Sequence, residues 1–149
     1  MSRHRRLKRK AWVEPDMMES EAFRTLPRNA MWVLLRFTQK MPWYDTKVAG
    51  NKHRVYENNG LTFTYAEANK FGISSASFYR SIKTLVERGF LDVEHRGGTF
   101  GRGEFKDYSR YKISDRWKKW GTENFKEKEF EVLKFEGEQI QARIKSRFH

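Results

Sequence analysis

The sequence predicts a mixed α+β fold, in which a three-helix core carries a small antiparallel β-sheet. Two stretches, residues 30–41 and 75–88, repeat apolar residues at the spacing of a buried helical stripe. A short segment with its own capping signals lies directly before the second stretch. Two alternating segments joined by a glycine-rich connection follow it. The order of these elements predicts the fold more strongly than any single residue.

The first core helix is expected between two prolines. Pro27 suits the first turn of a helix, and Pro42 ends the element. One apolar face between them consists of Ala30, Val33, Leu34, Phe37 and Met41. Trp32 lies on the flank of this face, and we expect it to be a core residue.

The polar and basic stretch from Pro42 to Gly60 predicts a turn near its end. Asn59-Gly60 is a strong hairpin signal, and it lies between the short segments Arg54–Tyr56 and Leu61–Phe63. We therefore expect these two segments to pair, with the second also joining the sheet. The part before them, residues 43–52, is expected to be a long loop.

Two helices joined by a tight turn follow. Thr64 is a good N-cap for a helix that begins at Tyr65, and Glu67 stands at the capping-box spacing. Gly72 can adopt the left-handed conformation that often ends a helix, and Ser74 can cap the next one. The turn is therefore placed at residues 71–74.

The next helix has two unlike faces and ends at Gly89. Its apolar stripe is expected to face the first helix and Phe71, and consists of Phe78, Ile82, Leu85 and Val86. The opposite face carries small and basic residues, namely Ser75, Ala76, Ser77, Tyr79, Arg80 and Lys83. Residues 90–95 and 108–113 then read as two strands, joined by a glycine-rich, basic loop that we expect to be flexible.

The string G-I-S-S-A-S-F-Y-R-S-I-K-T-L-V-E-R-G-F-L closely resembles the winged-helix DNA-binding families of bacterial regulators. It is also similar to the helix-turn-helix segment at the front of phage and plasmid replication proteins. The resemblance covers about residues 22–120. It implies a winged helix-turn-helix, in which the first core helix packs across the back of the two that read DNA.

A helix that reads bases needs small residues at its N-terminal end and long hydrogen-bond donors one turn later. The polar face of residues 75–83 has both, although an ordinary amphipathic helix with a solvated face would look similar. The expected DNA contacts of this helix are Ser75, Ala76, Ser77, Tyr79, Arg80 and Lys83. Those expected from the wing are Arg96, Arg102 and Lys106.

The net charge of +12 points to a polyanionic partner. Residues 1–120 hold 25 Lys plus Arg against 13 Asp plus Glu, whereas residues 121–149 hold 6 of each. An anionic membrane surface or an acidic protein is the weaker alternative. The N-terminal arm is expected to follow phosphates or to be only a solubilising tail, through Arg3, Arg5, Arg6, Lys8, Arg9 and Lys10.

Three regions are therefore expected: a flexible basic N-terminal arm at 1–21, a winged-helix domain at 22–120 and a charged C-terminal helical extension at 121–149. In the extension, Ile140, Ile144 and Phe148 follow a helical line. This line can pack on its own domain or on a second copy, and we expect a homodimer through this region.

Several classes of chemistry are not expected. The chain has no cysteine, its four histidines are scattered, and we expect no metal site. The glycines after Arg96 are not followed by Lys-Ser or Lys-Thr, so we expect no phosphate-binding loop. No nucleophile and base set stands out, and we expect no enzyme activity and no cofactor.

No apolar run reaches membrane-spanning length, so we expect a soluble, cytoplasmic protein that would be nucleoid-associated in a bacterium.

The sequence therefore predicts a non-catalytic protein that binds double-stranded DNA. A transcription regulator and a replication initiator or other mobile-element protein both fit this prediction. The alternative is an interaction module that binds structured RNA or protein, since a fold does not determine a function. Residues 43–53 are either a second nucleic-acid contact or a solvated insertion.

Overall fold

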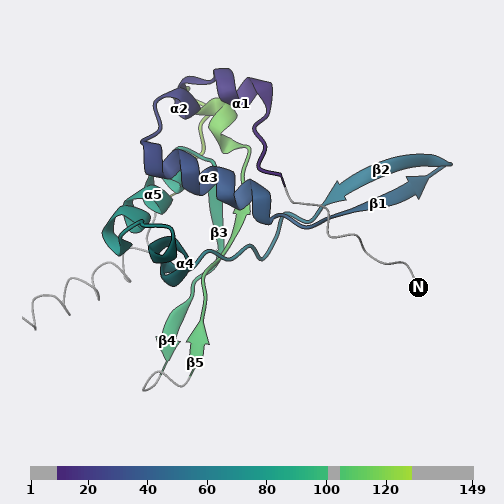
Figure 1. Ribbon diagram of the computed structural model, residues 1–149. Helices are drawn as coiled ribbons and strands as arrows, with labels where there is room; N and C mark the ends of the chain where they lie inside the picture. Colours follow the sequence, from purple (N-terminus) through teal and green to yellow (C-terminus); the bar gives the residue numbers. More distant parts are fainter. Residues whose placement is uncertain (1–9, 101–104, 129–149) are drawn as a thin grey trace, which may run out of the picture.

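The computed structural model describes residues 10–100 and 105–128, with only the backbone described at positions 98–100 and 105–107. The chain is a mixed α+β protein, as predicted, with helices on one side and three two-stranded antiparallel pairs (Figure 1). The helices are α1 Pro15–Glu19, α2 Glu21–Arg24, α3 Arg28–Lys40, α4 Tyr65–Lys70 and α5 Ser75–Glu87, with the 3-10 turn η1 at Arg116–Lys119. The strand pairs are β1 Trp43–Val48 with β2 Asn51–Tyr56, β3 Leu91–His95 with β6 Arg110–Ile113, and β4 Gly98–Phe100 with β5 Phe105–Asp107.

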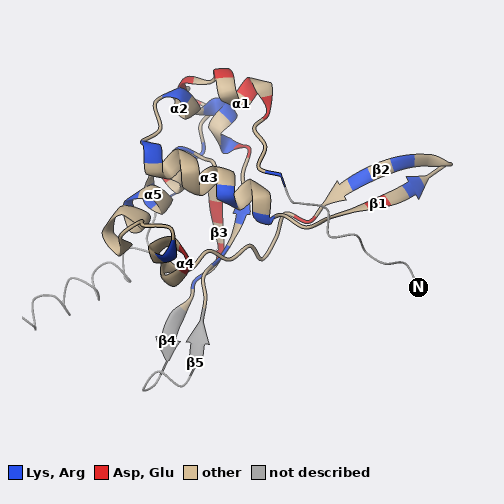
Figure 2. Ribbon diagram, in the orientation of Figure 1, with Lys and Arg blue, Asp and Glu red and all other residues tan. Residues whose placement is uncertain are grey.

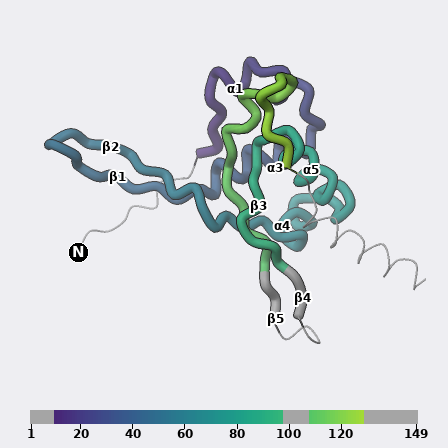
Figure 3. The backbone as a smooth tube through the Cα atoms, turned by 180° about the vertical axis from the view of Figure 1, so that it is seen from behind, coloured from purple at the N-terminus to yellow at the C-terminus, as the bar shows by residue number. Residues whose placement is uncertain are grey.

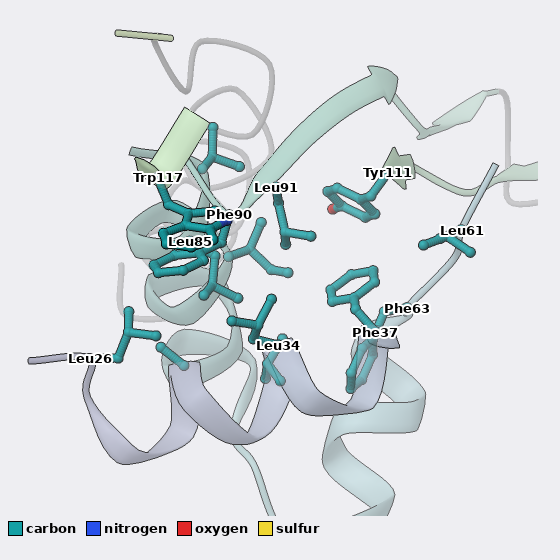
Figure 4. Packing of buried hydrophobic residues seen from close by; sticks show 14 of the residues in the cluster. Leu26, Leu34, Phe37, Leu61, Phe63, Leu85, Phe90, Leu91, Tyr111 and Trp117 are labelled. Atoms are coloured by element: carbon teal, nitrogen blue, oxygen red, sulfur yellow. The ribbon is translucent and has the colours of Figure 1, made fainter. Parts of the chain in front are cut away.

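The core lies between α3, α5 and the β3–β6 pair (Figure 4). Every residue predicted for the apolar faces of the two long helices is buried, which confirms both faces. Aromatic rings fill the rest: Phe63 contacts Phe37 and Phe78 with ring centroids 5.4 and 4.8 Å apart. Phe90 stacks on Trp117 at 6.0 Å. Trp32, which the sequence predicts as a core residue, is only half-buried and packs against this core.

The two helices joined by a tight turn are confirmed with their caps. The Thr64 hydroxyl accepts a hydrogen bond from the Glu67 backbone N–H, and Ser74 does the same for Ser77. The Glu67 carboxylate instead binds α3, with Oε1 3.1 Å from Arg36 Nη2 and Oε2 2.6 Å from Lys40 Nζ. Glu67 therefore ties α4 to α3.

The turn at residues 71–74 has the expected glycine geometry but an unexpected aromatic residue. Gly72 has a φ of 83°, and Ile73 is buried. Phe71 was expected among the residues facing the buried stripe, and this was wrong: its side chain is 48% exposed. It lies on the surface against Trp32 and beneath the Arg36 guanidinium.

The folded core also includes part of the segment assigned to the flexible arm. Within residues 10–21, Pro15–Glu19 forms α1, and Met17 is buried in the core. The backbone N–H of Trp12 donates to the Thr38 hydroxyl at 3.1 Å. The core therefore begins before residue 22.

The hairpin between α3 and α4 does not turn where the sequence predicts. Asn59-Gly60 does not connect paired strands, and the segment Arg54–Tyr56 pairs with β1 rather than with Leu61–Phe63. The turn lies at Ala49-Gly50, where both residues have positive φ, as in the type I′ turns that join twisted strands. The predicted loop at 43–52 is thus a β-ribbon. Leu61 does join the sheet, through a single bridge to Tyr111.

The second hairpin is longer than the sequence predicts. β3 pairs with β6 as expected, and the register shifts between Val93 and His95. The expected flexible loop is partly paired, because Gly98–Phe100 and Phe105–Asp107 continue the hairpin as β4 and β5. The Gly97 N–H donates to the Ser109 hydroxyl where the two parts join.

After β6 the chain forms η1, and Gly121 follows with a φ of 82°. Trp117 is buried, and Trp120 is half-buried against the core. The helical line of the predicted extension, Ile140, Ile144 and Phe148, lies outside the described residues. Over residues 10–100 and 105–128, no helix has the length and apolar character needed to cross a membrane.

Candidate nucleic-acid interface

The N-terminal end of α5 presents small side chains on an accessible surface. Ala76 is exposed, and Ser75 and Ser77 are half-buried. The Ser74 cap and the Gly72 turn fix where this helix begins, and the Ser74 hydroxyl binds the Ser77 N–H, one of the N–H groups that a helix start leaves without a partner in the helix. Such an end can approach a groove or a phosphate closely.

The long donors one turn later are also accessible. Arg80 is exposed, and its Nη2 lies 3.3 Å from the Ser77 hydroxyl, which holds the side chain along the helix toward its N-terminus. Lys83 is half-exposed, with Nζ 4.0 Å from Glu87 Oε1. An exposed ion pair of this kind contributes at most about 1 kcal/mol, so Lys83 can leave Glu87 and bind another anion. Arg80 and Lys83 thus have the position that the sequence predicts.

Tyr79 is only partly available as a contact residue. The side chain is half-buried and packs against the core cluster, whereas the sequence predicts an outward position beside Arg80. Its helical position places it between the buried stripe and the exposed face. Part of its surface therefore stabilises the domain.

The structure separates cations that hold the fold together from cations on the surface. Arg36 and Lys40 bind Glu67, and Arg88 donates to the Ala22 carbonyl and to the Thr25 hydroxyl. Arg116 is nearly buried beside Asp92. Among the described residues of α4 and α5, the exposed cations are Lys70, Arg80 and Lys83.

The β4–β5 hairpin leaves the body beside α4 in both views (Figures 1 and 3). Arg96 is exposed at the end of β3, and Arg110 on β6 is exposed opposite His95. Arg110 was missed by the sequence analysis, although its place in an alternating strand was visible. Arg102 lies outside the described residues, and so does the side chain of Lys106.

Of the six basic residues predicted for the arm, Lys10 is described, and it is exposed. The other five, Arg3, Arg5, Arg6, Lys8 and Arg9, lie outside the described residues. The structure therefore places the base of the hairpin beside α4, the helix that precedes α5 (Figure 1).

A second basic element is the β1–β2 ribbon, which the sequence analysis predicted as a loop that is either a second nucleic-acid contact or a solvated insertion. Lys47, Lys52 and Arg54 are exposed on it (Figure 2). The sequence signal for this ribbon was the alternation of residue types in the two segments on either side of Ala49-Gly50. Asn59-Gly60, a stronger turn signal, drew the prediction away from it.

No group of three or more His, Asp or Glu side chains suited to a metal ion occurs in the described residues. A scan of protein-family models, a search of curated proteins and a search of solved structures each found no match to this chain.

Proposed function

We propose that this protein binds double-stranded DNA as a winged helix-turn-helix, with α5 in the major groove and the β4–β5 hairpin on the adjacent backbone or minor groove. The observation that carries the proposal is the N-terminal end of α5. It combines a capped, exposed helix start and the small residue Ala76 with Arg80 one turn later. This is the arrangement in which a helix reads base edges.

The surroundings of α5 support the proposal. The turn at Gly72 and the Glu67 contacts hold α4 and α5 against α3, so the exposed side chains of α5 have a rigid support. The hairpin that follows α5 carries exposed basic residues at its base. Within the proposal, both a transcription regulator and a replication initiator or mobile-element protein would use this surface.

Selection from a random duplex library, followed by binding measured against salt concentration, tests the proposal. We expect a consensus sequence. Arg80→Ala should then cost about 1–3 kcal/mol on that sequence and relax discrimination at one position. The physical reason is that a guanidinium donates two hydrogen bonds to a guanine edge, which alanine cannot replace.

Deletion of residues 1–10 is the matched comparison, because it removes cations without touching α5. This deletion should weaken binding to all duplexes alike and reduce the salt dependence by about 0.9 for each lost phosphate contact. The proposed reading surface would be wrong if the deletion changed the consensus while Arg80→Ala left it intact. A parallel selection from random RNA hairpins that yields binders, while the duplex library yields none, would support the alternative of a structured-RNA binder.

A further inference from the structure

The β1–β2 ribbon extends from the body (Figures 1 and 2), and its strand register gives it two unlike faces. Cross-strand partners lie on the same face of an antiparallel pair, and successive residues alternate between faces. The register places one set together: Trp43 with Tyr56, Asp45 with Arg54, and Lys47 with Lys52. We name these six residues the cationic face. The opposite face consists of Tyr44 with Val55, Thr46 with His53, and Val48 with Asn51, and has no Lys, Arg, Asp or Glu.

The cationic face holds three cations against one carboxylate. Asp45 Oδ1 lies 3.3 Å from Arg54 Nε, and its Oδ2 lies 3.4 Å from Lys52 Nζ. The Arg54 guanidinium also lies over the Trp43 ring at 3.9 Å. Burial tends to raise the pKa of Asp45, but the hydrogen bonds from Arg54 and Lys52 outweigh this and lower the pKa. Asp45 is therefore ionised at neutral pH and neutralises one charge, which leaves an excess of two.

At the end of the cationic face, next to the turn, two like charges repel each other. Lys47 and Lys52 are cross-strand partners there. Like charges in this position destabilise a strand pair. A polyanion that binds both ammonium groups would remove that repulsion. The Lys52 contact with Asp45 would not prevent this, because Lys52 is 71% exposed and such pairs contribute at most about 1 kcal/mol.

The base of the ribbon is fixed to the β3–β6 pair. Asn58 Nδ2 donates to the Ile113 carbonyl, and the Ile113 N–H donates to Asn58 Oδ1, each at 2.7 Å. Leu61 and Tyr111 exchange two backbone hydrogen bonds at 2.9 and 2.8 Å. The ribbon and the second hairpin thus arise from one junction, and their positions relative to each other are set there.

Each strand of the ribbon has six residues, which corresponds to a length of roughly 20 Å. One turn of B-form DNA is about 34 Å long, so the ribbon is longer than half a turn of duplex. We propose that the cationic face of the β1–β2 ribbon contacts the phosphate backbone of duplex DNA that flanks the segment read by α5. This inference rests on the proposed function.

The test removes the two opposed lysines, with Lys47→Gln and Lys52→Gln combined in the full chain. The matched control is Lys118→Gln with Lys119→Gln, which changes the net charge equally on η1, beside α1 and away from the β4–β5 hairpin (Figure 3). Binding is measured against salt on the selected sequence extended to about 30 base pairs, roughly three helical turns. The ribbon variant should lower the salt slope by about 2, one for each lost phosphate contact, and leave the consensus unchanged. The control should keep the wild-type slope.

Two further measurements sharpen the result. On the shortest duplex that retains the consensus, the ribbon variant should bind like the wild type, because the flanking phosphates are absent. Asp45→Asn should bind the long duplex more tightly than the wild type, since it frees Lys52 and Arg54 from their shared carboxylate.

Equal salt slopes for the ribbon variant and the control, with Arg80→Ala still weakening specific binding, would overturn the ribbon contact and leave the proposed function standing. A wild-type protein that binds no duplex would overturn both. A ribbon variant that changes the sedimentation of the free protein but not its salt slope would also overturn the contact and make the ribbon a self-association surface.

Discussion

At the scale of single residues, Arg116 shows why charge alone does not identify a contact with DNA. Its Nε donates to Asp92 Oδ1 at 2.8 Å, and its Nη2 donates to the carbonyls of Val86 and Leu91. Its Nη1 donates to the Lys126 carbonyl. This side chain therefore joins the end of α5, β3 and the segment after η1, and its guanidinium is occupied within the fold.

Asp92 is the carboxylate on which this junction depends. Burial raises its pKa, but hydrogen bonds from Arg116 and Lys128 outweigh burial, so the pKa lies below the ordinary value. A lowered folded-state pKa stabilises the fold above the unfolded-state pKa of about 3.9, and this stabilisation is lost as pH falls through the folded-state value.

We therefore expect Asp92→Asn to lower the free energy of unfolding by about 3 kcal/mol at neutral pH, since one partner of a buried pair loses its charge. The deficit should begin to shrink as the pH falls below about 4, where the unfolded wild type takes up the proton, and should vanish once the pH falls through the lower pKa of the folded state. Urea unfolding across this pH range measures both effects. Asp45→Asn is the control, and it should change stability little because Asp45 is exposed. A deficit that is the same in acid as at neutral pH would refute the role assigned to the Asp92 charge.

At the scale of elements, two glycines with nearly the same φ end the helices on either side of the turn. Gly72 follows α4 with a φ of 83°, and Gly89 follows α5 with a φ of 87°. A Cβ at Gly72 would meet nothing within 4 Å, whereas one at Gly89 would lie 2.6 Å from the Trp117 backbone nitrogen. The two positions therefore separate backbone strain from a steric clash.

Gly72→Ala should destabilise the fold by about 1–2 kcal/mol, which is the cost of the left-handed conformation for alanine. Gly89→Ala should cost clearly more than about 2 kcal/mol, because η1 must move to relieve the contact. Chemical denaturation of both variants, monitored by tryptophan fluorescence, checks this. If both variants lost the same free energy of unfolding, the close approach of η1 to Gly89 would be contradicted.

Elements with local signals at both ends were predictable from the sequence. α4 and α5 have serine or threonine caps and a glycine at or near their ends, and these signals act within one turn of the chain. The β1–β2 ribbon was not predictable in the same way. Ala49 adopts a φ of 52°, which alanine rarely does, so its turn lacked the usual residues.

The candidate site was predictable to a similar extent. The exposure of Arg80 and Lys83 follows from helical periodicity, and the structure agrees. Tyr79 and Phe71 lie at boundary positions, where periodicity does not decide how much of a ring is buried. That depends on tertiary neighbours, such as Trp32 against Phe71.

At the scale of the whole molecule, the fold distributes its charge unevenly. Several central cations are bound by Glu67 or Asp92 or by backbone carbonyls. Exposed cations occur on many elements, as at Arg24, Arg28 and Lys118, and they include those on α5, at the base of the second hairpin and along the β1–β2 ribbon. The last of these extends the proposed surface well beyond one helix.

Assembly is the last prediction at this scale. One winged helix reads a short site, and specificity commonly comes from two copies on half-sites related by a two-fold axis. We expect a homodimer joined by the region after residue 128, where Ile140, Ile144 and Phe148 follow a helical line. The selected site should then be a palindrome with half-sites about ten base pairs apart, or a multiple of that.

The variant that tests this should end after Lys128, because the Lys126 carbonyl and Lys128 Nζ contact Arg116 and Asp92. A chain cut at Gly121 would lose those contacts and confuse lost stability with lost association. Sedimentation should show a dimer for the full chain and a monomer for the shortened one, with equal free energies of unfolding at a concentration where both are monomeric. A full chain that stays monomeric both free and on DNA would exclude the dimer, and a single copy would then depend on α5, the second hairpin and the ribbon for its affinity.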